Sequence, residues 1–511
     1  MKTTIIYALT LTALFFKLST MHAQALKNTK PNIVLVMTDD QGLVLGSLGH
    51  PVVKTPFLDK FAEKSARFSN FYMSPNCAPS RAALMSGAHE FRVAVTATHA
   101  ECERMALDIT TFPQLLQKEG YETGLFGKWH LGDLNEYLPQ NRGFSEVLMH
   151  GAGGIGQRER GVKITSYADF PPNQGDGKKA KYFDPVLLHN NTIVQTKGYC
   201  TDIFFNAGLA WMKEQKESEK PFFAYISTNA PHSPLIAPKE NLDRMIKRGM
   251  KKAEPRLAMI ENIDDNFGVL MEKLEKWDML DNTIVIFTSD NGAPGTDPNF
   301  MQGHKTGKGT PFEGGVHVPA FWYWKGKIKE NVDIDALTAH VDLYKTFCEL
   351  TGADISKVTQ ELEGRSLLPL LENPDSEWKP RIIQTQRGNI AKKPEASADK
   401  LWSVRTDRWR LVGKELYDLK NDPYEQKDVA SEYPFVVDAL TKSHFKWYKT
   451  MIPYMINQNN VWTDPQAPFE KLYTDQKAAK GIPNWAPANT DEPEVSHNNA
   501  KVLNWKRESI D

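Results

Sequence analysis

Four apolar runs, each closing on a polar turn, recur along the first 300 residues. They cover residues 31–40, 121–132, 221–235 and 282–295. The first contains "IVLVM", a continuous apolar stretch typical of a strand that is buried on both faces of a parallel sheet. Polar residues follow each run, including the pairs Asp39-Asp40 and Asp290-Asn291.

Helical patterns separate these predicted strands. They lie at residues 55–68, 111–120, 200–218 and 258–277. Strands that alternate with helices predict an α/β fold with a large, mostly parallel sheet flanked by helices. Because such folds bind ligands beyond the carboxyl ends of their strands, we expect the polar turns to meet at one edge of the sheet.

The pattern changes near residue 376. Residues 381–389, 401–412 and 415–429 resemble antiparallel strands with tight turns, and a helix is predicted over 433–452. We therefore expect a large α/β domain at 26–375 and a smaller α+β domain with an antiparallel sheet at 376–511. The last fifty residues are expected to wrap the surface rather than fold independently.

The amino terminus predicts export. A basic start, "MKTT", precedes the apolar run "IIYALTLTALFF" and an "AQA" cleavage signal, which together are typical of a signal peptide over residues 1–25. The run is short for a membrane span, so an uncleaved anchor is the less favoured alternative and no span is expected after cleavage. We expect a periplasmic or secreted protein.

Composition gives no reason to expect a nucleic-acid partner. The chain has 62 Lys and Arg against 63 Asp and Glu, a net charge of −1. A near-neutral chain lacks the general positive charge that nucleic-acid binding uses. An anionic ligand would therefore need a local cationic pocket.

The carboxylates at the strand ends form a candidate metal site. Asp39, Asp40, Asp290 and Asn291 together offer the hard oxygen ligands that calcium or magnesium prefers. For either pair alone, a helix cap or an Asx-turn is the more common role. Two such pairs after matched strands favour a metal site.

Five cationic or titratable residues are predicted in turns or at helix starts: Arg81, Lys128, His130, His232 and Lys308. Any one of them alone is usually a structural or solvated residue. Gathered around a divalent metal, they would provide the positive charge that a dianionic oxyanion substrate requires.

Cys77 opens the stretch "CAPSRAALMSG" at the predicted start of a helix. A helix amino terminus favours a thiolate nucleophile, but a soft sulfur donor suits a hard, oxygen-ligated cation poorly. An exported chain could instead pair this cysteine with Cys102, Cys200 or Cys348 in a disulfide. The residues alone leave this choice open.

The ordered motifs resemble those of type I sulfatases, in the alkaline-phosphatase-like superfamily. The resemblance rests on C-x-P-S-R at Cys77, "PNIVLVMTDDQG", "GYETGLFGKWHLG", "APHSPL", "FTSDNGAPG" and "GKGTPFEGGVHVPAFWYW", and it covers nearly the whole chain. It implies that a formylglycine-generating or anaerobic sulfatase-maturating enzyme oxidises Cys77 to formylglycine. The hydrated aldehyde, a geminal diol, would attack sulfur, and inorganic sulfate would leave as the aldehyde is restored.

The resemblance also assigns roles to the candidate residues. It implies one Ca²⁺ ion, with ligands from Asp39, Asp40, Asp290, Asn291 and the modified residue 77. Arg81 and Lys128 would hold the charge of the diol and sulfate, and His130 would assist proton removal from the diol. His232 and Lys308 would bind sulfate and assist leaving-group departure. Lys305 competes for the last role, but the spacing of Lys308 to "FEGG" favours Lys308.

Sulfated carbohydrate, in the context of polysaccharide degradation, is the substrate class that the resemblance favours. A phosphate or phosphonate ester hydrolase of the same superfamily and a catalytically silent glycan-binding relative are the alternatives. Residues 88–105, the glycine-rich segment at 151–164 and the C-terminal domain are candidate substrate loops. Arg92, His99 or Trp402 could contact a sugar there, although surface or packing roles are favoured for each.

Overall fold

The computed structural model describes residues 26–155, 182–295, 302–388, 393–458, 460 and 468–490. The predicted signal peptide, most of the 151–164 segment and the end of the chain lie outside the described residues. None of the helices in these ranges is both long enough and apolar enough to cross a membrane.

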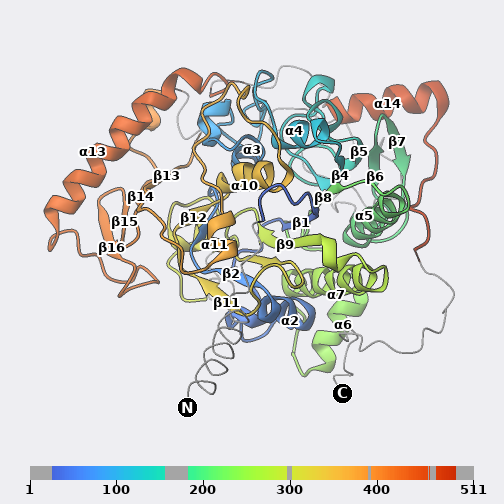
Figure 1. The fold of residues 1–511 in the computed structure, drawn as a ribbon, viewed down its shortest axis with the longest axis horizontal. Helices are drawn as coiled ribbons and strands as arrows, with labels where there is room; N and C mark the ends of the chain where they lie inside the picture. Colours follow the sequence, from blue (N-terminus) through green and yellow to red (C-terminus); the bar gives the residue numbers. More distant parts are fainter. Residues whose placement is uncertain are drawn as a thin grey trace, which may run out of the picture.

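A mixed sheet forms the centre of the described chain (Figure 1). In spatial order its ten strands are β11 (Val332–Ile334), β2 (Ala66–Phe68), β10 (Ala320–Tyr323), β9 (Thr283–Ser289), β1 (Asn32–Thr38), β8 (Phe222–Ser227), β4 (Glu122–Lys128), β5 (Glu146–His150), β6 (Val186–His189) and β7 (Thr192–Gln195). The central five, from β9 to β5, are all parallel. They include the four predicted strands, so the predicted α/β fold is confirmed.

Helices cover both faces of this sheet, because the residues of β1 are apolar on both sides. Ile33, Leu35 and Met37 belong to one core cluster, whereas Val34 and Val36 belong to another. The first cluster includes residues of α3 (Cys77–Ser86), α4 (Phe112–Lys118), α10 (Asp342–Thr351) and α11 (Leu368–Glu372). The second includes residues of α2 (Pro56–Lys64), α5 (Cys200–Glu217), α6 (Lys239–Lys247) and α7 (Pro255–Lys276).

The helix predicted over residues 55–68 is too long. Helix α2 ends at Lys64, and residues Ala66–Phe68 form the strand β2 instead. This strand pairs with β10 and β11, which lie more than 250 residues later in the chain. Ala66 and Phe68 are buried while Arg67 is half-buried, so the strand period replaces the helical one after Lys64.

The predicted antiparallel sheet near the carboxyl terminus is present. Its strands, in order, are β13 (Ile383–Gln386), β14 (Trp402–Arg405), β15 (Trp409–Val412) and β16 (Glu415–Asp418). Helix α13 (Pro434–Met451) packs on this sheet through Leu440, which lies in one cluster with Val404 and Leu411. The domain boundary at residue 376 stays a prediction.

Part of the tail crosses to the other side of the molecule, where α14 (Pro468–Lys480) lies beside β7 (Figure 1). The Gln476 side chain accepts from the backbone N–H of Ile193 and donates to its carbonyl, so the tail is bonded to the sheet edge. The remaining strands and α-helices are β3 (Phe71–Tyr72), β12 (Thr338–Ala339), α9 (Glu313–Val316) and α12 (Pro394–Ser397).

Candidate active site

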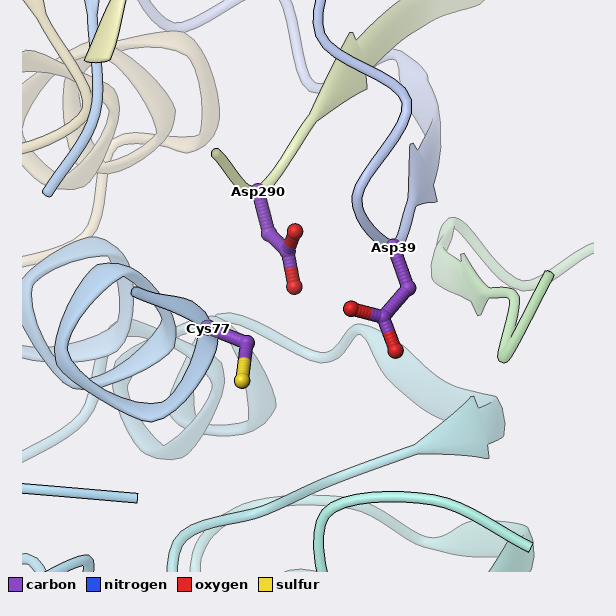
Figure 2. Close-up of side chains that lie close together, drawn as sticks. All are labelled: Asp39, Cys77 and Asp290. Carbon is purple, nitrogen blue, oxygen red and sulfur yellow. The ribbon is translucent and has the colours of Figure 1, made fainter. Parts of the chain in front are cut away.

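The carboxyl ends of β1 and β9 meet the start of α3, and side chains from all three point into one space (Figure 2). A carboxylate oxygen of Asp39, one of Asp290 and Sγ of Cys77 lie within 4.8 Å of one another, and all three residues are buried. Thr38 pairs with Ser289 in the parallel register of β1 and β9. Asp39 and Asp290 therefore follow at the same level of the sheet, as the matched strand ends predict.

Asp40 joins the same cluster although it is adjacent to Asp39. Its φ of 66° turns the backbone, and one of its carboxylate oxygens lies within 4.8 Å of ligand atoms of Asp39 and His232. Asn291 donates from Nδ2 to Asp40 Oδ1 at 2.8 Å. Asn291 Oδ1 is buried and has no hydrogen-bond partner among the described residues. The same is true of Asp39 Oδ1. Two orphaned oxygens in an acidic cluster fit a bound hard cation such as calcium.

Burial and mutual repulsion perturb these carboxyl groups. Burial raises the pKa of Asp39 to about 6, although Lys128 acts in the opposite direction. Burial and the neighbouring Asp39 also raise the pKa of Asp290. Burial alone would raise the pKa of Asp40, but Lys308 and His232 hold it below its usual range. A divalent cation would stabilise the ionised forms of carboxylates that repel one another. The raised pKa values of Asp39 and Asp290 and the unpaired oxygens therefore both favour a cation site.

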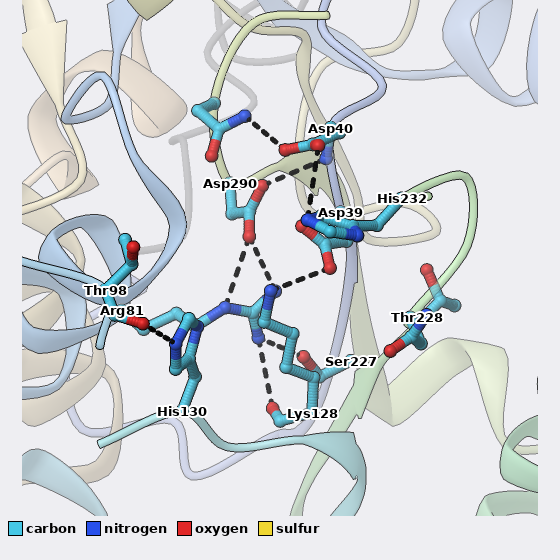
Figure 3. Close-up of polar contacts among 12 residues, drawn as sticks. Asp39, Asp40, Arg81, Thr98, Lys128, His130, Ser227, Thr228, His232 and Asp290 are labelled. Carbon is cyan, nitrogen blue, oxygen red and sulfur yellow. Dashed lines mark hydrogen bonds and ion pairs between the residues drawn. The ribbon is translucent and has the colours of Figure 1, made fainter. Parts of the chain in front are cut away.

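Each aspartate contacts one cationic side chain. Lys128 Nζ lies 2.7 Å from Asp39 Oδ2, and Arg81 Nη2 lies 2.7 Å from Asp290 Oδ2 (Figure 3). Lys308 Nζ lies 2.6 Å from Asp40 Oδ1. Lys305 instead contacts Glu415 and Tyr417 of the C-terminal sheet, at 3.0 and 2.6 Å. Lys308 is thus the lysine of this loop that reaches the acidic cluster.

The two candidate histidines are held by backbone carbonyls. His130 Nε2 lies 3.0 Å from Thr98 O, and a carbonyl only accepts, so this nitrogen carries the proton (Figure 3). Nδ1 is buried with no hydrogen-bond partner among the described residues. Burial and Lys128 hold the pKa of His130 well below its usual value. The ring is therefore neutral, with a lone pair on Nδ1 that can accept a proton.

His232 has the opposite ring orientation. Its Nδ1 donates to Ser233 O at 2.6 Å, and its Nε2 lies 3.7 Å from Asp40 Oδ2. Burial lowers the pKa of His232, while Asp40 acts in the opposite direction. A histidine with Nε2 beside Lys308 and the acidic cluster can exchange a proton with a bound group.

Cys77 is the first residue of α3 and is 3% exposed. Burial would raise the pKa of its thiol, but Lys128 and Lys308 lower it below the usual value. No disulfide joins Cys77, Cys102, Cys200 or Cys348, all of which lie in the described ranges. The disulfide alternative for Cys77 is therefore wrong.

Several supporting residues escaped the sequence analysis. The Tyr182 hydroxyl donates to His232 O at 2.8 Å and accepts from Asn229, and the Ser227 hydroxyl accepts from Arg81. Ser227 ends a predicted strand, so its position was a usable signal. Tyr182 carried no such signal, because it precedes β6 and approaches His232 only in the folded chain.

Two of the three proposed sugar contacts have structural roles. Arg92 lies 2.7 Å from Glu363 and 3.2 Å from Glu361 in ion pairs. Trp402 is buried and stacks on His444, with ring centroids 4.0 Å apart. The favoured packing role of Trp402 is confirmed. His99 as a sugar contact stays a prediction.

A family model described as Sulfatase matches residues 31–353. The chain belongs to the sulfatase family. A second model, the C-terminal part of N-sulphoglucosamine sulphohydrolase, matches residues 307–446 of this sulfatase. Sulfatases of this type belong to the alkaline-phosphatase-like superfamily, as the sequence motifs predict.

Sequence relatives and solved structures agree with this membership. An uncharacterized sulfatase, YdeN, of Escherichia coli (strain K12) is 31% identical over 62% of this chain, which spans 57% of that relative. Human arylsulfatase A is 33% identical over 80% of this chain and 86% of its own length. The crystal structure of Ps i-CgsB superposes with a TM-score of 0.70 at 26% identity, covering 89% of this chain and 98% of that one.

Proposed function

We propose that this sulfatase hydrolyses sulfate esters of a sulfated carbohydrate and releases inorganic sulfate. The proposal rests on one observation: Cys77 lies within 4.8 Å of the Asp39 and Asp290 carboxylates, which the buried cations Arg81 and Lys128 contact. An oxyanion that binds beside residue 77 meets positive charge that is already in position, with little reorganisation needed.

The residues present fit the two groups that the family implies. Asp39, Asp40, Asp290 and Asn291 would hold a calcium ion, and formylglycine made from Cys77 would supply an oxygen nucleophile beside it. Together these groups would supply the attacking oxygen and the charge that stabilises the sulfuryl oxygens. The orphaned oxygens of Asp39 and Asn291 support the calcium site.

The remaining residues bind, orient and transfer protons. Arg81 and Lys128, 1% and 0% exposed, fix Asp290 and Asp39 and contribute positive charge to the sulfate pocket. His130 Nδ1, whose lone pair has no partner among the described residues, would accept the proton of a hydroxyl on the modified residue 77. Lys308 and His232 lie on the Asp40 side, where they bind sulfate oxygens and stabilise the departing alcohol oxygen.

The carbohydrate substrate and the cellular location complete the proposal. The Ps i-CgsB structure has also been solved in complex with k-i-k-neocarrahexaose, which supports an oligosaccharide as the substrate class here. The predicted signal peptide supports a periplasmic or secreted enzyme. A formylglycine-generating or anaerobic sulfatase-maturating enzyme would then act on the chain before folding.

The experiment combines mass spectrometry with matched ester substrates. The peptide containing residue 77, from a host with the maturation machinery, is expected to carry an aldehyde. Wild-type protein should release sulfate from an aryl sulfate much faster than phosphate from the matching aryl phosphate, and Cys77→Ala should abolish sulfate release. Cys348→Ala, a buried cysteine in α10, is the control and should retain turnover. Full activity in Cys77→Ala would refute the mechanism, and faster phosphate release would favour the phosphate or phosphonate hydrolase.

A further inference from the structure

Arg387 approaches the catalytic residues from the C-terminal sheet. It follows β13, and its Nη1 donates to Gly309 O at 3.3 Å, next to Lys308. A Cβ built on the following residue, Gly388, would lie only 2.0 Å from Thr96 O. The backbone after β13 is therefore pressed against the loop that positions His130 through Thr98. Arg387 consequently lies between the loop of Lys308 and the loop that holds His130.

The Asn76 side chain approaches the same glycine, Gly309. It directly precedes Cys77 and takes the N-cap position of α3, yet its side chain makes no cap hydrogen bond. A Cβ built on Gly309 would lie 3.6 Å from Arg387 Nη1 and 3.9 Å from Asn76 Nδ2. Gly309 has a φ of +80°, a conformation that favours glycine. Because residue 309 is a glycine, no side chain at this position contacts the two donors.

The charge of Arg387 has no counter-charge among the described residues, unlike the charges of Arg81, Lys128 and Lys308. Arg81, Lys128 and Lys308 each contact an aspartate. Arg387 is exposed, and no ion pair within the described part of the chain includes it. A guanidinium offers a planar fork of donors that matches the oxygens of a sulfate or carboxylate. An exposed fork next to Gly309, one residue from Lys308, is thus available to a substrate.

We propose that Arg387 and Asn76 bind a second anionic group of the substrate, next to the sulfate ester that is cleaved. This inference rests on the proposed function and refines its substrate class to saccharides that carry a further sulfate or a carboxylate. Arg387 and Asn76 touch the neighbouring substituent and not the reacting sulfur, so they determine specificity.

Kinetics on matched substrates test this inference with the mature, full-length protein. The probes are hexose monosulfates, the same hexoses with a second sulfate, and the same monosulfates linked to glucuronate. Wild-type protein should show a higher kcat/KM for at least one doubly anionic series. Arg387→Gln should reduce that preference about tenfold, the loss expected for one charge-assisted hydrogen bond. The series that loses its advantage identifies the second group as sulfate or carboxylate.

Two further variants make the result decisive. Lys442→Gln removes a charge from α13 of the same sheet-and-helix unit, where Lys442 is 75% exposed, and should leave the preference unchanged. Arg387→Lys keeps the charge but loses the fork, so the preference should fall about threefold. This variant decides the question if thermal melting shows that Arg387→Gln is unfolded.

The inference fails if the wild-type protein prefers no doubly anionic probe, or if the Arg387 variants change kcat/KM by the same factor for singly and doubly anionic probes. The proposed function fails differently, since the wild-type protein would then release no sulfate from any probe or from aryl sulfates.

Discussion

A buried glutamate gives a prediction that depends only on the fold. Glu90 is 2% exposed, and its Oε2 accepts from the Ser74 hydroxyl at 2.9 Å. Burial raises the pKa of Glu90 from 4.5 to about 7. Burial also lowers the pKa of the two nearby histidines, His340 to about 3 and His89 well below its usual value. Neither histidine therefore supplies a positive charge that would stabilise the ionised carboxylate.

The sign of the pH dependence follows from the two pKa values. The folded chain keeps the Glu90 proton up to about pH 7, whereas the unfolded chain releases it near pH 4.5. This contribution to stability is complete below pH 4.5 and is lost as the pH rises through 7. At ~1.4 kcal/mol per pKa unit, the loss in the free energy of unfolding is about 3.5 kcal/mol. Since the unfolding entropy is ~2.1 cal/mol/K per residue, this loss lowers Tm by about 3 °C.

Thermal melting of Glu90→Gln between pH 4.5 and 8 measures this loss. Glutamine has nearly the same shape and cannot ionise, so the variant should gain about 3 °C relative to the wild type across this range. Glu217→Gln, on the exposed side of α5, is the control and should give a constant difference. A constant difference for Glu90→Gln as well would mean that the buried carboxyl is ionised in the folded chain, and the reasoning would be wrong.

Three further predictions concern the site and its supports. Asn291→Leu removes an orphaned buried oxygen, so Ca²⁺ should bind about tenfold more weakly by calorimetry, and its stabilising effect on Tm should fall accordingly. Tyr182→Phe removes the hydrogen bond to His232 O, and kcat for an aryl sulfate should fall about fivefold while Cys77 maturation stays complete by mass spectrometry. Trp402→Ala leaves a cavity beside His444 and should cost about 3–5 kcal/mol in denaturant unfolding; a loss below 1 kcal/mol would contradict its place in the core.

The centre of the fold was predictable because its signal is local. A run such as Ile33–Met37 is apolar on every residue, and only a strand covered on both faces uses such a run. The polar ends of parallel strands share an edge for geometric reasons, so the meeting of Asp39 with Asp290 followed from the same signal. The fold class and the acidic cluster could therefore both be predicted from these strands and their polar ends.

The edges of the sheet were not predictable in this way. Strand β2 has three residues and β10 has four, and each is defined by a partner far away in the sequence. In a strand this short, the alternation of apolar and polar residues covers too few positions to be distinguished from the pattern of a neighbouring helix. The approach of Arg387 to Gly309 has the same origin, since it depends on how the C-terminal sheet packs and not on any pattern near residue 387.

The charged side chains of the site form ion pairs that no sequence motif reveals. Three aspartates face Arg81, Lys128 and Lys308, so the six charges sum to zero when all six groups are ionised. A neutral cluster does not attract a sulfate ester over distance. Attraction of an anion to this site then depends on a further positive charge, which a divalent cation on the orphaned oxygens would supply to the cluster. The exposed guanidinium of Arg387 supplies a positive charge at the edge of the site whether or not a cation is bound to the cluster. Substrate capture should therefore weaken with added salt, because salt screens the exposed Arg387 more strongly than the buried Arg81 and Lys128.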